Sequence, residues 1–262
     1  PDADPGAGEV RVQVVHASAA AAAAGPLDVY VTARGASLGG ASPIGTFSFK
    51  ESLGPLTVPA GDYRIRVTPQ GSTGSVVYDS GTVSLAGGSD LVVSAIDNVG
   101  PANGPRNAPV RLLVAPEGGS SFTLVDAGAG AALGAAHLSE GAPNVDVALD
   151  QDWMSAPFTD VAFDTISGYA DVLPAGTYDI DIAGTGTTTS VAGIDGASLE
   201  AGNRYTAYAV GVLSGMPALD LVLAEDESRS VATEARLRVV HAASGAVTAL
   251  GGNGEVDVYL TP

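Results

Sequence analysis

Residues 237–243 read Leu-Arg-Val-Val-His-Ala-Ala and residues 10–18 read Val-Arg-Val-Gln-Val-Val-His-Ala-Ser, so the end of the chain repeats its beginning. The segment that follows is repeated too, as Leu-Asp-Val-Tyr-Val at 27–31 and Val-Asp-Val-Tyr-Leu at 256–260. A weaker copy lies between them, in residues 135–147. Self-similarity of this kind predicts two full copies of one module and the first strands of a third.

Two further landmarks give the first two copies one common spacing. The stretch Pro-Ala-Gly-Asp-Tyr begins at Pro59 and its twin Pro-Ala-Gly-Thr-Tyr at Pro174, an offset of 174 − 59 = 115 residues. The glycines of a second turn, Gly87 and Gly202, are also 202 − 87 = 115 residues apart. Because two independent landmarks share one offset, the duplication does not arise by chance.

Short strands separated by turns are predicted throughout both copies. The chain holds 35 Gly and 16 Pro, and 45% of its residues are hydrophobic, which favours frequent turns without favouring disorder. In residues 10–14 valines alternate with Arg11 and Gln13, the pattern of a half-buried strand. About seven such strands recur in each copy, with no long amphipathic helix between them. The predicted fold is therefore all-β: tandem immunoglobulin-like (Greek-key) β-sandwiches with a C-terminal partial third repeat.

The module boundaries follow from these repeats and from the Gly- and Ser-rich stretches between them. We expect a flexible N-terminal segment, a first sandwich, a linker, a second sandwich, and finally a second linker with the opening strands of a third module. The predicted bounds of these five parts are residues 1–9, 10–115, 116–131, 132–225 and 226–262.

The motifs Arg-Val-x-x-His-Ala-Ser, x-Asp-Val-Tyr-Val and Pro-Ala-Gly-x-Tyr together resemble the DUF4397 domain, a family of uncharacterised function found in exported bacterial and archaeal proteins, often in tandem. The resemblance covers nearly the whole chain. It is looser in the second copy, where Gly-Ala-Ala-His at 134–137 stands in place of Arg-Val-Val-His. It implies a β-sandwich at the cell surface and brings no established catalytic residue.

The charge balance excludes several classes of partner. The chain has 29 acidic and 11 basic residues, for a net charge of −18, so it repels nucleic acid and anionic lipid. It has no cysteine, and no run of 18 apolar residues that would insert in a membrane. The polar start at Pro1 is typical of a mature protein whose signal peptide has been removed. We therefore expect a secreted or cell-surface location.

The three histidines occupy one position in the module, the end of its first strand. A histidine can be a metal ligand or a base, but residues about 100 positions apart do not form one shared site. We instead expect each imidazole to hydrogen-bond within the turn to the second strand, to the aspartate that opens it. The expected structural pairs are His16 with Asp28, His137 with Asp146, and His241 with Asp257.

Motifs for catalysis and metal binding are weak in this sequence. Ser37 lies in a Gly-x-Ser-x-Gly match, but the helix that a nucleophile elbow requires does not follow it, and we predict that the protein is not an enzyme. Asp146, Asp150 and Asp152 are weak calcium candidates, because no twelve-residue calcium loop surrounds them. No other cofactor is expected. Binding of glycans or calcium at the cell surface, as in adhesion, is the alternative function.

The partial third module leads to the main functional hypothesis. Two strands alone are marginal in water, since their apolar face and ladder edges have no partner. A second copy of the chain, a continuation of the polypeptide, or the second module itself would complete them. The first option predicts head-to-tail self-association by strand addition, and hence a filament or surface assembly. The apolar positions expected to mediate it are Leu237, Val239, Val240, Val256, Val258 and Leu260.

Overall fold

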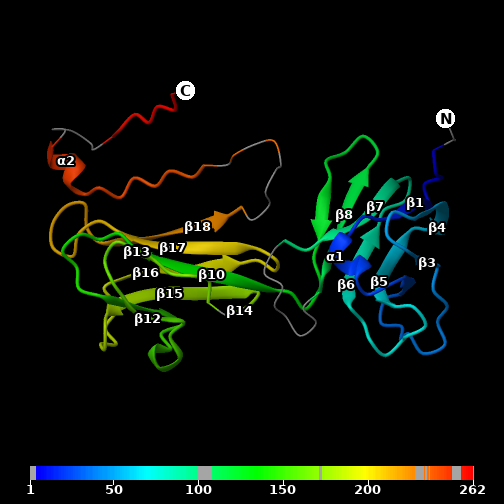
Figure 1. The fold of residues 1–262 in the computed structure, drawn as a ribbon, viewed down its shortest axis with the longest axis horizontal. Helices are drawn as coiled ribbons and strands as arrows, with labels where there is room; N and C mark the ends of the chain where they lie inside the picture. Colours follow the sequence, from blue (N-terminus) through cyan, green and yellow to red (C-terminus); the bar gives the residue numbers. More distant parts are fainter. Residues whose placement is uncertain are drawn as a thin grey trace. The chain divides into compact units, whose positions relative to one another are not determined.

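The computed structural model describes residues 4–99, 108–170, 173–227, 233, 235, 237–249 and 255–261. The chain divides into two compact units, Pro1–Gly130 and Ala131–Pro262. Both units are built almost entirely of strands (Figure 1). The prediction of an all-β, tandem-sandwich fold is confirmed. Among the described residues, no helix has the length and apolar character needed to cross a membrane.

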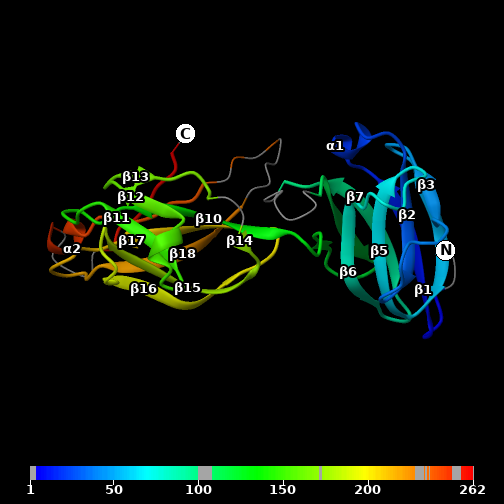
Figure 2. The same cartoon turned by 90° about the horizontal axis from the view of Figure 1, so that it is seen from below.

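The first unit is a sandwich of two sheets. One sheet has the order β4-β1-β7-β8-β9 and the other the order β3-β2-β5-β6; Figure 2 shows β5 between β2 and β6. The chain crosses between the sheets after β1, β3, β4 and β6, as in a Greek key. The elements are β1 (Glu9–His16), α1 (Ala19–Ala22), β2 (Leu27–Ala33), β3 (Gly45–Phe47), β4 (Ser52–Pro59), β5 (Gly61–Pro69), β6 (Tyr78–Leu85), β7 (Asp90–Asp97), β8 (Val110–Pro116) and β9 (Phe122–Leu124).

The second unit repeats this arrangement. Its sheets have the orders β13-β10-β17-β18, with β14 also on β10, and β12-β11-β15-β16. In Figure 1, β10, β17 and β18 lie side by side. The elements are β10 (Gly130–His137), β11 (Val145–Leu149), η1 (Trp153–Ser155), β12 (Phe158–Val161), β13 (Thr165–Ile166), β14 (Leu173–Pro174), β15 (Gly176–Gly184), β16 (Ala192–Leu199), β17 (Arg204–Val210) and β18 (Asp220–Asp226).

The first strand of each unit occupies the same central place. β1 runs parallel to β7 and β10 runs parallel to β17, and both strands end at the histidine of their copy. A parallel pair of this kind requires a long crossover between its strands, which the rest of each sandwich supplies. The first strand therefore lies inside its sheet, with the rest of the same sandwich built around it.

The repeated Pro-Ala-Gly-x-Tyr motif forms the same local structure twice. The Tyr63 hydroxyl donates to the Pro59 carbonyl oxygen at 2.7 Å, and the Tyr178 hydroxyl donates to the Pro174 carbonyl oxygen at the same distance. Each bond spans the crossing from one sheet to the other, because Pro ends β4 or β14 and Tyr lies in β5 or β15. The tyrosine therefore fixes the corner that joins the sheets.

The segment predicted as a linker at 116–131 belongs to the first sandwich. Phe122–Leu124 forms β9 on the edge of β8, and the Tyr78 hydroxyl donates to the Leu124 carbonyl oxygen at 3.2 Å. The carboxylate of Asp126, which is buried, accepts hydrogen bonds from the backbone N–H groups of Asp79 and Gly128. The first unit consequently extends to Gly130 rather than to residue 115.

The repeated sequence at the end of the chain does not form the predicted strands. The structure assigns no strand to the described residues 237–249 and 255–261, and Gly245–Ala249 is a short helix, α2. A segment with the pattern of a strand becomes one only beside a partner, because its backbone hydrogen bonds come from the neighbouring strand. The remaining strands of a third sandwich are not among the described residues.

Candidate functional site

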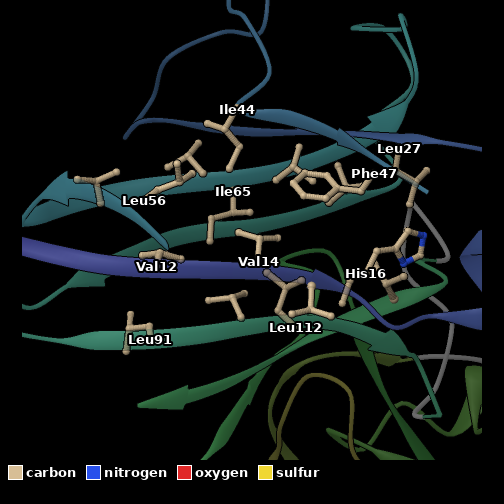
Figure 3. A pocket seen from close by; sticks show the side chains of 18 of the residues that line it. Val12, Val14, His16, Leu27, Ile44, Phe47, Leu56, Ile65, Leu91 and Leu112 are labelled. Carbon is tan, nitrogen blue, oxygen red and sulfur yellow. The ribbon is translucent and has the colours of Figure 1, made fainter. Parts of the chain in front are cut away.

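The interior of the first sandwich contains an apolar cavity of about 80 Å³ between its two sheets. Valine, leucine, isoleucine, alanine and phenylalanine side chains line it, together with His16. Figure 3 shows His16 at one end of these side chains and Val12 and Leu91 toward the other. A void of this volume costs a sandwich about 2 kcal/mol, because the surrounding atoms lose packing contacts.

The two sandwiches carry different side chains at matching positions of this wall. In the first unit Val12 pairs with Leu91 and Val14 with Val93, whereas the corresponding pairs in the second unit are Leu133 with Tyr205 and Ala135 with Ala207. Leu133 and Ile180 are completely buried in the second core. Ile65, which matches Ile180 in the repeated motif, is only half-buried in the first unit.

His16 is the polar residue of the cavity wall, and it is 3% exposed. Its Nδ1 accepts a hydrogen bond from the Ser18 backbone N–H at 3.4 Å, so in the neutral ring the proton lies on Nε2. That Nε2 atom is buried and has no hydrogen-bond partner. His16 therefore has a buried donor without an acceptor, and this nitrogen is not exposed to the cavity, whose surface comes from apolar atoms alone.

The matching histidine of the second unit is satisfied. His137 Nδ1 accepts from the Ser139 backbone N–H at 3.3 Å, and its Nε2 lies 3.0 Å from the Pro143 carbonyl oxygen, to which it donates. The two rings thus share one tautomer and one position. They differ in whether the second nitrogen has an acceptor.

The predicted histidine–aspartate pairs are not formed. Asp28 accepts hydrogen bonds from the Thr46 hydroxyl at 2.6 Å and the Gly71 backbone N–H at 2.8 Å, and Asp146 accepts from the backbone N–H groups of Asp160 and Gly186. Each aspartate therefore ties β2 or β11 to the loop that follows β5 or β15. The histidines instead bind backbone groups of the turn itself, at Ser18 in the first unit and at Ser139 and Pro143 in the second.

The third predicted pair lies in the C-terminal segment. His241 and Asp257 are both exposed, and the Asp257 carboxylate lies 3.5 Å from the Tyr259 hydroxyl. Neither residue lies in a strand.

The pH dependence of the first unit should report on His16. Burial lowers the pKa of His16 from its usual 6.5, and the charge of Asp97 offsets this in part. The unfolded chain then binds the proton more readily, so stability falls as the pH drops from 6.5 toward the lower folded value. We expect urea unfolding to show a free energy of unfolding that falls as the pH is lowered through about 6.5.

The substitution His16→Phe should flatten this part of the profile, and His137→Phe should leave the profile of the first unit unchanged. Asp97 does not contribute in this window, because the Ser18 hydroxyl and the Ala20 N–H lower its pKa from 3.8. A slope that persists in the His16→Phe variant would show that another group binds the proton.

A charged cluster in the first unit has no counterpart in any sequence motif. Arg64 binds the buried carboxylate of Asp79 through two nitrogens, at 2.8 and 2.5 Å. Arg66 lies nearby and donates to the Thr32 hydroxyl and the Ala36 carbonyl oxygen, both at 2.7 Å. Burial, and then the charge of Arg64, lower the pKa of Arg66. The Thr32 and Ala36 partners of Arg66 are 34 and 30 residues away in sequence, so no local motif reveals this cluster.

The calcium candidates are not gathered into a site. Asp150 accepts from the Asp179 backbone N–H at 2.9 Å, Asp152 accepts from the Ser155 N–H at 3.2 Å, and Asp146 binds the backbone groups described above. Among the residues that the structure describes, no three carboxylate or histidine side chains are placed to hold one metal ion. The three aspartates organise separate turns.

The six residues predicted to mediate assembly all have solvent-exposed side chains. Leu237, Val239, Val240, Val256, Val258 and Leu260 are between 42% and 84% exposed. Counted from the histidine or aspartate of each copy, all six correspond to residues that line the cavity of the first sandwich: Val12, Val14, Val15, Leu27, Val29 and Val31.

Comparison with known proteins gives one family. A family model described as "Domain of unknown function (DUF4397)" matches residues 10–129 and 131–250. No curated protein matches the chain.

Among solved structures, the chain is similar to a "putative cell adhesion protein" from Bacteroides ovatus ATCC 8483, at 13% identity and a TM-score of 0.26, over 88% of this chain and 99% of the other. A protein of the same description from Bacteroides uniformis ATCC 8492 is 11% identical with a TM-score of 0.26, over 84% and 99%. Similarity at this level assigns neither a ligand nor a partner.

Proposed function

Because this chain belongs to the DUF4397 family, in two tandem copies, we propose that it is an extracellular structural protein of the cell surface that self-associates through its C-terminal repeat. The two sandwiches act as folded spacers, and residues 237–260 pair with strands of a second molecule. The observation that carries this proposal is the exposure of apolar side chains in a segment whose sequence copies buried strands.

The sequence match supports pairing as a strand. Leu237 and Val239 alternate with Arg238 as Val12 and Val14 alternate with Gln13 in β1. An aliphatic side chain that stays exposed to water lacks the roughly 1.5–3 kcal/mol of stabilising free energy that full burial provides. A free edge of another sheet offers both the ladder hydrogen bonds and an apolar surface.

The acceptor that fits best is β18. In the first unit the corresponding strand, β8, carries β9 on its outer side, whereas β18 is the last strand of its sheet among the described residues. Val222 of β18 is 47% exposed. Arg238 already binds the Asp226 carboxylate and the Glu225 carbonyl oxygen at the end of β18, so this edge has affinity for the segment.

The test compares the full chain with a variant that ends at Asp226. We expect the full chain to form oligomers that grow with concentration in light scattering and appear as fibres in negative-stain microscopy, and the shortened variant to stay monomeric. Addition of a strand buries an interface far smaller than the standard ~1,600 Å², so the assembly should be weak and dependent on concentration.

A point variant and its control locate the contact. Leu237→Asp with Val239→Asp should abolish assembly, because a charge would be buried at each site, while Ser244→Asp in the same segment should not. Fibres that persist in the shortened variant would refute strand addition. Fibres that form only when calcium is added would favour the calcium-binding alternative instead.

A further inference from the structure

We propose that Arg64 and Arg66, on the outer face of the sheet β3-β2-β5-β6, bind a carboxylate group, as carried by a small organic acid or an acidic sugar. This inference does not depend on the C-terminal segment or on self-association, and it gives a binding role to the charged cluster of the first unit.

The two arginines lie on the side of β5 that points away from the interior of the sandwich. Ile65, which lies between them, lines the internal cavity, and strand alternation turns Arg64 and Arg66 to the opposite side. Arg66 is only 6% exposed there, because the chain after β2 covers it. Its Nη2 donates to the Thr32 hydroxyl and to the Ala36 carbonyl oxygen, both at 2.7 Å. These two bonds hold the guanidinium of Arg66 in a fixed position.

Two positive charges share one negative charge in this cluster. Asp79 forms an ion pair with Arg64, whereas it acts on Arg66 through its charge alone. Burial and the charge of Arg64 lower the pKa of Arg66, and the charge of Asp79 offsets this only in part. Asp28 and Asp62, on the same side of the sheet, accept hydrogen bonds from neutral hydroxyl and N–H groups instead. A second carboxylate beside the arginines would balance the remaining positive charge.

Each guanidinium has one nitrogen left for a ligand. Arg64 donates to Asp79 through Nε and Nη2, and Arg66 uses Nη2 for its two oxygen partners. Nη1 of both arginines has no hydrogen-bond partner among the described residues, and neither Nη1 belongs to the buried atoms that lack one, so both reach solvent. Nε of Arg66 is buried and takes no part in the site. One carboxylate accepts from two such donors at once, through its two oxygens.

The second copy of the module shows that its fold does not require these arginines. The common offset of 174 − 59 = 115 residues places Asp179 at the position of Arg64 and Asp181 at that of Arg66. These aspartates lie in β15, which pairs with β11 and β16 as β5 pairs with β2 and β6. The same strand therefore forms with the opposite charge. A role in binding accounts for two positive charges that the strand itself does not need.

The test uses the full chain with labelled arginine side chains, followed by nuclear magnetic resonance at constant ionic strength. The probes are sodium acetate, sodium glucuronate and, as the neutral match, glucose. We expect saturable shifts of the Arg64 and Arg66 guanidinium signals with both carboxylates and none with glucose. Because the chain carries a net charge of −18, the dissociation constant should be on the order of 1 mM and should rise with added salt. The ratio of the acetate and glucuronate constants distinguishes a simple acid from an acidic sugar as the preferred ligand.

A variant and its matched control locate the contact. Arg66→Gln should weaken binding of both carboxylates about tenfold, the value of one hydrogen bond to a charged group. Lys50→Gln makes the same change in net charge at an exposed position of the same unit, and should change binding by less than about twofold. Arg66→Lys keeps the charge without the planar fork, and should weaken binding about threefold even if Arg66→Gln folds poorly.

Three results would overturn the proposal. The first is that neither carboxylate shifts the arginine signals with saturation. The second is that glucose shifts them as glucuronate does. The third is that Lys50→Gln weakens binding as much as the substitutions at Arg66, which would assign the effect to net charge rather than to this site.

Discussion

The substitution Asp79→Ala should destabilise the first unit by about 2 kcal/mol, because it removes a buried carboxylate and its hydrogen bonds while Arg64, whose side chain is 35% exposed, keeps contact with water. Asp79 is 2% exposed and its carboxylate binds two nitrogens of Arg64 and the Gly81 backbone N–H. Without it, Arg64 loses its partner and faces the charge of Arg66, whose pKa is already lowered by burial and by Arg64. The alanine side chain can accept none of these hydrogen bonds.

The chain contains its own reference for this measurement. Trp153 is the single tryptophan and lies in the second unit, so its fluorescence follows that unit, while circular dichroism follows both. Urea unfolding of Asp79→Ala should move the dichroism transition of the first unit and leave the tryptophan transition in place. Asp62→Ala, which removes an exposed carboxylate bound to the Ser84 hydroxyl on the same strand pair, should cost less than about 0.5 kcal/mol. Equal effects of the two substitutions would show that the Arg64 pair contributes nothing.

The substitution Ile180→Ala should cost the second unit about 4 kcal/mol, near the upper end for isoleucine in a filled core. Ile180 is completely buried between two sheets. Ile65 holds the same place in the first unit but lines the cavity, so part of its surface already lacks packing contacts. Ile65→Ala should therefore cost only about 2 kcal/mol.

Urea unfolding measures both costs. Tryptophan fluorescence follows the second unit and gives the cost of Ile180→Ala, and circular dichroism gives the cost of Ile65→Ala. The two isoleucines share their place in the repeated motif and their chemistry, although Ile180 pairs with Ile194 and Ile65 lies at an irregularity of the β5–β6 pairing. If the two substitutions cost the same, the cavity does not weaken the packing of Ile65.

Local sequence signals predicted most of the elements. Alternation in residues 10–14 located β1, and the Pro-Ala-Gly motifs mark the corners of both copies. Such features depend on residues that are neighbours in the chain, so their pattern is visible in the sequence.

Contacts between distant residues were missed or misassigned. The Asp126 carboxylate binds the Asp79 backbone from 47 residues away, which places a predicted linker inside the first sandwich. The histidines were assigned to the nearest aspartates, but Asp28 and Asp146 bind loop amides that are 43 and 40 residues away. Residue type shows that a buried polar group needs a partner, and only the packed fold selects which one.

The sequence by itself determined that one module is written twice and begun a third time, that it is made of strands, and where its corners lie, because repetition and turn chemistry are properties of the local chain. The tertiary structure decided the rest. The volume left between two sheets depends on side chains from strands far apart in sequence, such as Val12 of β1 and Leu91 of β7, so no local pattern reveals the cavity of the first sandwich. Residues 237–242 show the same rule: they have the pattern of a strand and no strand results, because a ladder requires a partner that the local sequence does not contain.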